Sequence, residues 1–174
     1  IRMEWIQGQV VQRQVWSPGL FTLSVKAPGV APFEPGQFLQ LGLEQPEKHL
    51  HRPYSVASPH GNILDFFIVL VEDGHLTPKL WDLREGDRVD VSSKAAGSFT
   101  LSHVPPSKVL WLIATGTGLA PYIAMIRSGE IFHDYEKVIV VHGVRFKQDL
   151  AYQEEFADYQ NHHGNSFVYI PAVS

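Results

Sequence analysis

The sequence predicts two domains: an all-β antiparallel six-stranded barrel, followed by the first part of a doubly wound α/β domain. Eight of the 12 prolines lie between Pro18 and Pro78, among short runs that alternate apolar and polar residues, a pattern typical of antiparallel strands. After the breaking stretch 102–107 the runs become continuously apolar and alternate with helical periodicity. We therefore place the domains at residues 1–103 and 104–174.

The barrel is expected to contain six strands and one helix. Turn signals separate the strands: in Ser17-Pro18-Gly19, for example, proline fixes φ and glycine allows a positive φ. A short helix over Leu76–Leu83 is expected to cover one end of the barrel. The expected strands are Gly8–Ser17, Leu20–Ala27, Gln37–Leu43, Tyr54–Ala57, Ile63–Val71 and Arg88–Ser92.

The second domain follows a strand–helix–strand–helix–strand order, which is that of half a Rossmann-like sheet. Its first two strands are continuously apolar, which predicts strands buried on both faces. In the second helix Tyr152, Phe156 and Tyr159 repeat at helical spacing, whereas Glu154 and Glu155 fit a solvated face. The expected elements are a strand at 108–114, a helix at 119–127, a strand at 137–142, a helix at 149–159 and a strand from about Ser166.

Composition excludes several classes of function. The 174 residues include no cysteine, so a disulfide framework, a zinc ribbon or a thiolate-held iron–sulfur cluster is excluded. A net charge of −4 without blocks of like charge gives no support to nucleic-acid binding. The longest apolar run, Val109–Ala114, is far shorter than the roughly 20 residues of a membrane span, and no leader is visible, so a cytoplasmic location is expected. We expect no metal, because the spacing of His49, His51 and His60 matches no ligand pattern.

A glycine-rich turn follows the first strand of the second domain. Gly116, Thr117 and Gly118 lie between a buried strand and a helix, where free N–H groups and the helix dipole favour a phosphate. Pro121 stands where a dinucleotide fingerprint has its third glycine, and it is tolerated in a first helical turn. The turn indicates dinucleotide binding, and the alternative is a βα turn without a ligand.

The end of the second strand indicates which dinucleotide is bound. Residues 142–147 include no carboxylate for a ribose 2′-hydroxyl. Arg145 instead offers a guanidinium that matches a 2′-phosphate, which favours NADPH over NADH. The alternative is that Arg145 is a solvated loop charge. His142 fits a packed residue at the end of the strand better than a catalyst.

A second motif, Arg52-Pro53-Tyr54-Ser55, combines a cation, an aromatic ring and a hydroxyl at the end of a barrel loop. Together with the G-T-G-x-x-P turn of the second domain it resembles the ferredoxin/flavodoxin NADP(+) reductases, and the bacterial subclass is the nearest. The resemblance covers essentially the whole chain. It extends over the stretches 33–42, 67–77, 72–83, 93–99 and 110–122.

The resemblance implies an FAD site on the barrel and an NADP(H) site on the second domain. Arg52 would hold the FAD pyrophosphate, Tyr54, which follows Pro53, would pack on the flavin, and Ser55 would hydrogen-bond near flavin N5, so Tyr54 and Ser55 are the catalytic candidates. The strand Phe67, Ile68 and Val69 would line the cofactor, and His75, Leu76 and Thr77 would offer backbone N–H groups to the pyrophosphate. Gly116, Gly118 and Pro121 would form the NADPH pyrophosphate turn, Thr117 would lie between flavin and nicotinamide, and Val144 and Arg145 would hold the adenosine phosphate.

The activity that the resemblance implies is electron transfer between NADPH and ferredoxin or flavodoxin through FAD, by a monomer. Lys48, Arg52, Lys79 and Arg84 form a docking patch for an acidic carrier or are scattered surface charges. Family members continue past the third strand of this domain, so we expect that residues up to Ser174 bind FAD whereas NADPH binding and turnover are weak or absent. The alternatives are the reductase module of an oxygenase system and a non-catalytic flavin or nucleotide sensor.

Overall fold

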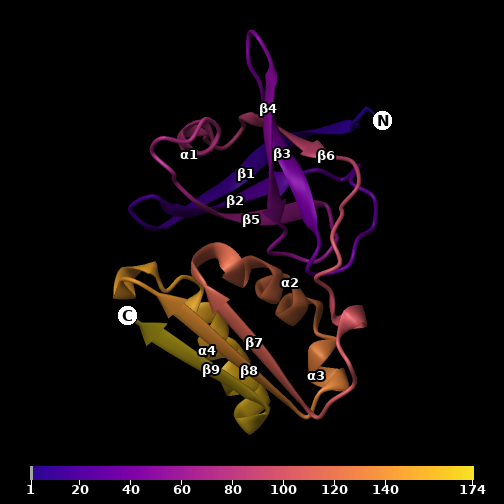
Figure 1. The fold of residues 1–174 in the computed structure, drawn as a ribbon, viewed down its shortest axis with the longest axis vertical. Coiled ribbons are helices and arrows are strands. Elements are labelled where there is room, and N and C mark those ends of the chain that lie inside the picture. The colour runs from indigo at the N-terminus through magenta and orange to yellow at the C-terminus, as the bar shows by residue number, and fades with distance from the viewer. Residues whose placement is uncertain (1) are drawn as a thin grey trace.

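The N-terminal half of the molecule is an antiparallel barrel (Figure 1). The structure is a computed structural model that describes residues 2–174. Six strands pair in the order β4-β3-β6-β1-β2-β5, and a bridge between Val56 and Phe66 brings the two ends of the sheet together. The six-stranded antiparallel sheet predicted from the sequence is thus confirmed. The strands are β1 (Trp5–Ser17), β2 (Leu20–Lys26), β3 (Phe38–Glu44), β4 (His49–Ser55), β5 (Ile63–Val69) and β6 (Arg88–Ser92).

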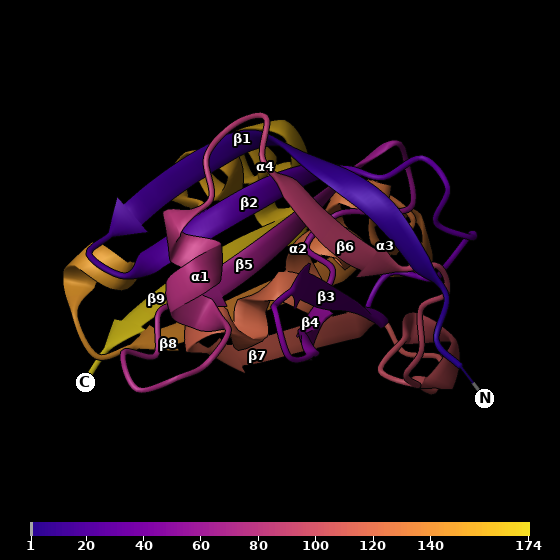
Figure 2. The ribbon, with the colours of Figure 1, turned by 90° about the horizontal axis from the view of Figure 1, so that it is seen from above.

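Alternate residues of these strands fill the barrel core. Leu39 and Leu41 of β3 are fully buried, as are Val89 and Val91 of β6. The short helix α1 (Thr77–Asp82) covers the end of the barrel that is farther from the second domain (Figures 1 and 2). Its Leu80 is fully buried in the barrel core, which holds the helix in place.

Strand β4 differs from its expected bounds. It begins at His49 instead of Tyr54, so the motif that starts at Arg52 lies on a strand and not in a loop. Pro53 is paired in register with Gln40 of β3. Proline is tolerated here because β4 is an end strand of the sheet, so its missing N–H interrupts no second ladder.

The second domain is a parallel three-stranded sheet in the order β7-β8-β9. Its βαβαβ order is the one predicted, with additional short helical turns. The helix α2 ends at Gly129, whose φ of 82° gives the chain a left-handed cap that favours glycine. No helix among the described residues is long and apolar enough to cross a membrane. The elements are β7 (Val109–Thr115), η2 (Gly116–Leu119), α2 (Ala120–Ser128), α3 (Ile131–Asp134), β8 (Lys137–Val144), η3 (Lys147–Asp149), α4 (Gln153–His163), η4 (Gly164–Ser166) and β9 (Phe167–Val173), after η1 (Leu101–His103) in the linker.

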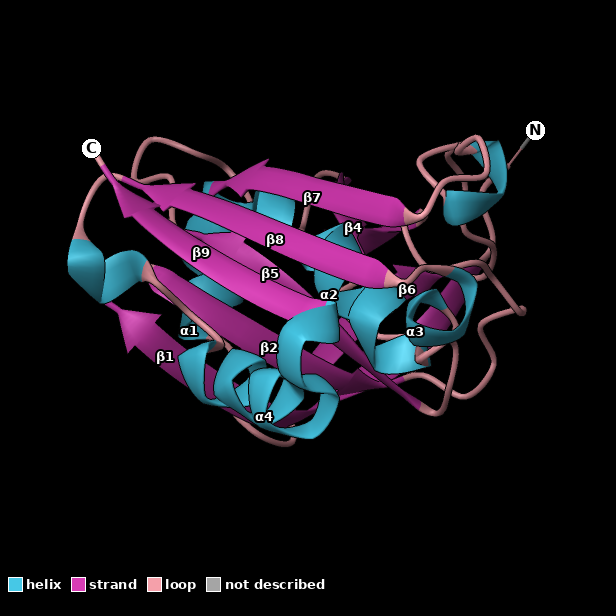
Figure 3. Ribbon diagram, turned by 90° about the horizontal axis from the view of Figure 1, so that it is seen from below, coloured by secondary structure: helices cyan, strands magenta, loops and turns pink. Residues whose placement is uncertain are grey.

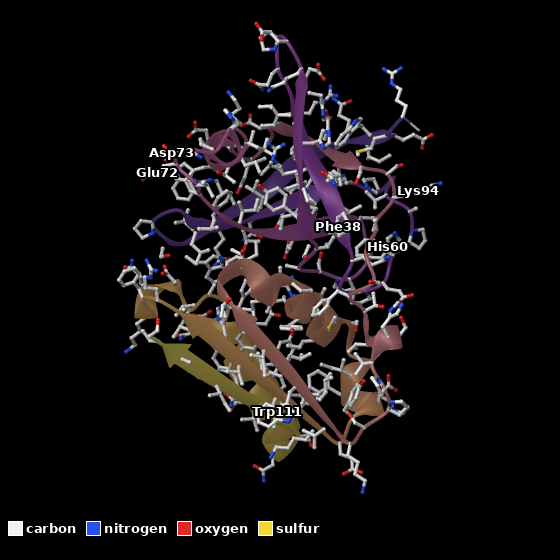
Figure 4. The ribbon with its side chains drawn as sticks, in the orientation of Figure 1. Phe38, His60, Glu72, Asp73, Lys94 and Trp111 are labelled. Atoms are coloured by element: carbon white, nitrogen blue, oxygen red, sulfur yellow. The ribbon has the colours of Figure 1, made fainter. Side chains whose placement is uncertain are left out.

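The expectation that β7 is buried on both faces is wrong. Leu110, Leu112 and Ala114 pack under the helices, but Trp111 is 55% and Ile113 is 63% exposed. The physical reason is that α2 and α4 both contribute to the core on one face of the sheet. In Figure 3 the other face is turned to the viewer and no helix crosses in front of β7 and β8, and Figure 4 shows Trp111 on this sheet, away from the barrel.

The apolar core of the α/β domain extends into the barrel and is shared by the two domains. Leu20, Ala57 and Phe67 belong to the barrel, yet their side chains cluster with the buried residues of the α/β domain. The turn η2 also contacts β5 at this junction. The second domain therefore packs partly on residues of the barrel. This contact sets the positions of the functional residues described below.

Candidate functional site

A cleft of about 530 Å³ lies between the domains at the carboxyl ends of β7, β8 and β9. This is where ligands bind in open α/β sheets, and its volume is that of a small-molecule site. The barrel contributes the β1–β2 turn and the end of β5. The lining residues are Pro18, Leu20, Val69, Thr115, Gly116, Thr117, Gly143, Val144, Arg145, Asp149, Ala172, Val173 and Ser174.

The glycine-rich turn forms one wall of the cleft. Gly116 has a φ of +54°, a left-handed conformation that favours glycine, and it opens the 3₁₀ turn η2 before α2 begins. A Cβ added to Gly116 or Gly118 would meet no heavy atom within 4 Å, so the space above this backbone is open. Pro121 is buried in the first turn of α2, where its missing N–H leaves no bond unmade. The turn therefore fits a phosphate group.

His142 holds this turn in place through a hydrogen bond to Gly116. Its ring is fully buried at the end of β8, and its Nε2 lies 3.0 Å from the carbonyl oxygen of Gly116. Since a carbonyl only accepts, Nε2 carries the proton and donates. Nδ1 has no hydrogen-bond partner among the described residues. Burial lowers the pKa of His142, although the bond to Gly116 opposes the shift. The ring is therefore a neutral positioning group, as the sequence interpretation of a packed histidine has it.

The stability of the chain is expected to fall at acid pH because of His142. Its folded pKa lies below the ordinary value of 6.5, so the unfolded state binds more protons. The contribution of His142 to the free energy of unfolding should therefore be fully present above about pH 6.5. It should decrease as the pH falls toward the lowered pKa of the folded state. Urea titrations at about pH 8 and about pH 5 measure this decrease.

His142→Gln provides the control, because the amide keeps an N–H donor for Gly116 but does not titrate. The variant should lose less stability than the wild type between the two pH values. Equal losses would mean that other groups account for the acid sensitivity.

Arg145 lines the cleft together with the glycine turn and directly follows the end of β8. It is exposed and has no carboxylate partner among residues 2–174, so its guanidinium is free to bind an anion. The neighbouring Asp149 is in the same cleft, but its Oδ1 accepts a 2.6 Å hydrogen bond from Ser17 Oγ of the barrel. Val144 is buried beside Arg145 and offers apolar surface.

On the barrel, β4 presents the residues of the Arg52 motif. Arg52 and Pro53 are exposed, whereas Tyr54 and Ser55 are half-buried. Arg52 Nη1 donates to its neighbour His51 O at 2.7 Å, and no carboxylate among the described residues pairs with the guanidinium. Tyr54 packs on the barrel core, and burial raises the pKa of its phenol although Arg52 opposes the shift. These side chains can offer a phosphate clamp, an aromatic face and a hydroxyl.

The other barrel residues expected in the site have different exposures. Phe67 and Ile68 are buried, in the shared core and in the barrel core respectively, so only their backbone can meet a ligand. Val69 is 47% exposed and lines the cleft. His75 is exposed, Leu76 is buried, and Thr77 hydrogen-bonds with the backbone of Val71 through its hydroxyl. They follow the turn with Glu72 and Asp73 at the outer edge of the barrel (Figure 4).

The cleft thus brings together Val69, Gly116, Thr117, Val144 and Arg145, whereas Gly118 and Pro121 follow in the chain without lining it. The sequence reasoning missed Pro18, Leu20, Asp149 and the end of β9 as lining residues. Residues at the end of β9 could have been found from the rule that ligands bind at the carboxyl ends of parallel strands. The residues of the β1–β2 turn form an ordinary proline–glycine turn in the sequence, so no pattern there predicts that they line a cleft.

The architecture and the cleft together define a class. The barrel carries on an end strand an arginine without a carboxylate partner among residues 2–174, and it shares a cleft with a parallel sheet whose first turn is open to a phosphate. This combination is typical of oxidoreductases that use a flavin and a nicotinamide nucleotide. The residues fit both groups, because two guanidinium groups and an open glycine backbone are free for phosphates.

Comparison with known proteins narrows this class to a family. The model of the oxidoreductase FAD-binding domain matches residues 7–100, and that of the oxidoreductase NAD-binding domain matches residues 112–174. The chain belongs to the family of oxidoreductases with an FAD-binding domain. This agrees with the FAD and NADP(H) predicted from the sequence and with the recognised resemblance.

Individual relatives agree with this placement. A flavodoxin/ferredoxin–NADP reductase from Escherichia coli is 43% identical over 150 residues, which are 86% of this chain and 60% of that protein. The structure of a ferredoxin NADP+ reductase from Neisseria gonorrhoeae with bound FAD and NADP has a TM-score of 0.91 at 26% identity, and the match covers 99% of this chain and 69% of that one. The cytochrome P450 reductase GcoB from Amycolatopsis has a TM-score of 0.84 at 26% identity, over 98% and 52% of the chains. The chain spans about 60% of the length of the curated relatives it matches.

Proposed function

We propose that this chain is the flavin- and nucleotide-binding part of a reductase that passes electrons between NADPH and ferredoxin or flavodoxin. The observation that carries the proposal is the shared cleft, in which Arg145 and the glycine turn of one domain face the end of β5 from the other. A nucleotide bound there contacts both domains. The relative from Escherichia coli, whose name states this activity, supports the proposal.

FAD is proposed to lie against residues 1–103 and NADPH against residues 104–174. Arg52 binds the FAD pyrophosphate, Tyr54 packs on the flavin beside Pro53, and Ser55 donates a hydrogen bond to it. Phe67 and Ile68 contribute through the free edge of β5, which is an end strand of the sheet. The remaining FAD contacts are Val69, His75, Leu76 and Thr77, and the NADPH contacts are Gly116, Thr117, Gly118, Pro121, Val144 and Arg145.

The hard chemistry belongs to the cofactor: FAD accepts a hydride and releases electrons one at a time. The residues of the chain bind the two nucleotides, orient them and exclude water from the site. The shared apolar core formed with Leu20 and Phe67 fixes the two domains, so the sites for the two nucleotides keep one relative position. Ser55 and Tyr54, half-buried at the end of β4 nearer the second domain (Figure 1), hold a flavin ring at the junction.

The acceptor is proposed to be a small acidic carrier. Lys48, Arg52, Lys79 and Arg84 are all exposed and offer it a cationic surface. We propose that the protein acts as a cytoplasmic monomer. A second candidate, the reductase module of an oxygenase system, is favoured by the similarity to the Amycolatopsis P450 reductase. The rate at which the reduced protein is reoxidised by flavodoxin or ferredoxin, compared with a P450, separates the two candidates.

The first test of the function is cofactor binding. When the purified chain is titrated with FAD, binding is expected to quench the flavin fluorescence. About one FAD should bind per chain, because the barrel offers one dinucleotide site. Anaerobic NADPH should then bleach the flavin absorbance faster than NADH. A single-turnover measurement is needed because turnover by this chain is expected to be slow. Absence of FAD binding would contradict the proposal.

Arg145→Ala is expected to remove the preference for the 2′-phosphate. A bidentate guanidinium–phosphate interaction contributes about 1.5–3 kcal/mol, so the affinity for 2′-phospho-AMP should fall roughly tenfold to a hundredfold. The affinity for AMP, which lacks this phosphate, should remain unchanged and serves as the matched control. Isothermal titration with the two nucleotides measures the difference. If both affinities fell equally, Arg145 would have no role in the choice of nucleotide.

A further inference from the structure

A hydrogen-bonded network crosses the domain junction around Arg127 of α2. All three nitrogens of its guanidinium are used: Nε and Nη2 donate to the carboxylate of Glu155 on α4 at 3.0 and 2.8 Å, and Nη1 donates to Asp65 Oδ2 on β5 at 2.7 Å. Nη1 also donates to the carbonyl oxygen of Ala57 at 3.2 Å. One side chain of the second domain is thus bound to two segments of the barrel and to a second helix of its own domain.

Tyr152 makes a second crossing a few residues before Glu155. It is buried, and its hydroxyl lies 2.6 Å from Thr22 Oγ1 on β2. Its ring lies between Trp16 and Phe67 of the barrel, with centroids 4.5 and 5.2 Å away. With a φ of 63° it is the one non-glycine residue among residues 2–174 in the left-handed region. A tyrosine persists in this conformation where the surrounding contacts fix it.

The charges of this network are partly shielded from water. The side chains of Arg127, Asp65 and Glu155 are only 24%, 19% and 27% exposed. Burial alone would lower the pKa of Arg127, but the hydrogen bonds and charges of Glu155 and Asp65 outweigh burial and raise it. Ser24 Oγ holds the other oxygen of Asp65 at 2.6 Å. The geometry is therefore specific to one arrangement of the domains.

The network lies on a different face of the junction from the nucleotide cleft. Its residues line a separate cavity of about 590 Å³, between β1 and β2 of the barrel and the start of α4. The two faces are connected, because Asp149 of the cleft is three residues before Tyr152 and is itself bonded to Ser17 of the barrel. We therefore expect a rotation of one domain that breaks the network to change the width of the cleft as well.

We propose that Arg127 and Tyr152 are positioning residues for electron transfer. The interdomain network, defined as Arg127, Asp65, Glu155, Tyr152 and Thr22, holds the two domains in the one orientation in which the flavin and nicotinamide sites face each other. None of its side chains lines the cleft. The orienting role stands on the geometry alone, whereas its consequence for hydride transfer rests on the proposed function.

The experiment measures the domain orientation directly. The chain has no cysteine, so Lys26→Cys on β2 and Asn161→Cys on α4, both exposed, give a unique pair of spin labels across the junction. Electron–electron double resonance on the otherwise wild-type chain should give one narrow distance distribution. Arg127→Met, Tyr152→Phe and Glu155→Gln should each broaden it. An unchanged distribution in all three variants would overturn the proposal.

Glu154→Gln is the matched control, because Glu154 precedes Glu155 on the same helix but is exposed and makes no side-chain hydrogen bond or ion pair among residues 2–174. It should leave the distribution narrow. Tyr152→Phe removes only a hydroxyl, so it keeps the proposal testable if Arg127→Met does not fold. Broadening by Glu154→Gln equal to that by Glu155→Gln would also contradict the proposal.

A second readout separates positioning from stability. In the FAD-loaded protein Tyr152→Phe and Glu155→Gln should leave FAD affinity unchanged and slow single-turnover reduction by NADPH roughly tenfold to a hundredfold, because small misplacement of reacting groups has such effects. If the wild type bound no FAD while the spin-label distances behaved as expected, the proposed function would be refuted. The orienting role of the interdomain network would still stand. Normal reduction rates in variants with broadened distances would refute the positioning role.

Discussion

Phe156→Ala is expected to lower the free energy of unfolding by about 3–5 kcal/mol, the typical cost of a fully buried aromatic residue. Phe156 is fully buried under the parallel sheet. Its ring stacks on that of Tyr169, with the ring centroids 4.2 Å apart, and the centroid of the Phe167 ring is 6.3 Å away. Truncation leaves a cavity between α4 and β9 that the surrounding backbone cannot close. Chemical denaturation followed by circular dichroism measures the loss.

The matched control is Phe146→Ala, because Phe146 is 56% exposed and its removal should change stability by less than about 0.5 kcal/mol. The second domain depends on Phe156 more than the barrel does, so the variant should also separate the unfolding of the domains into two transitions. A loss below about 1 kcal/mol would contradict the assigned position of the ring in the core.

Arg52→Ala is expected to weaken FAD binding roughly tenfold to a hundredfold, because a charge-assisted bond to a phosphate contributes about 1.5–3 kcal/mol. The guanidinium of Arg52 has no carboxylate partner among the described residues, so its removal leaves no buried charge behind and little stability should be lost. Fluorescence titration with FAD measures the affinity, and thermal unfolding checks the fold.

Arg84→Ala provides the comparison for Arg52. Arg84 is another exposed arginine of the barrel whose Nη1, like that of Arg52, donates to nearby carbonyl oxygens, but it follows α1 and lies outside the Arg52 motif. Its removal should leave FAD affinity unchanged. Similar losses in both variants would indicate general attraction by positive charge instead of a specific clamp at Arg52.

Local patterns were sufficient to predict most of the barrel. Alternating residues and proline–glycine turns gave five of its strands to within a few residues, because side-chain period and turn chemistry are local properties. Strand β4 was placed too late, since Pro53 argues against a strand in the sequence, and only the pairing order shows that β4 is an end strand. The chemistry of Arg52 and Tyr54 was visible even so, because it depends on residue type and spacing.

The relation between the domains could not be predicted in this way. The apolar run of β7 indicates a buried strand, but which faces are covered depends on where the helices pack. Glu155 was expected on a solvated face, and this expectation is wrong, because its partner Arg127 is 28 residues away in the sequence. Tyr152 fitted the inner face of a helix, but it precedes α4 and points to the barrel. Long-range partners leave no local pattern.

The shared core has a consequence for how such proteins can be recombined. The two family models meet between residues 100 and 112, so a chimera joined there would appear to exchange complete modules. Leu20, Ala57 and Phe67 would nevertheless stay with the barrel and leave the incoming domain without part of its own interior. A successful exchange must therefore transplant these three positions from the donor along with its nucleotide domain.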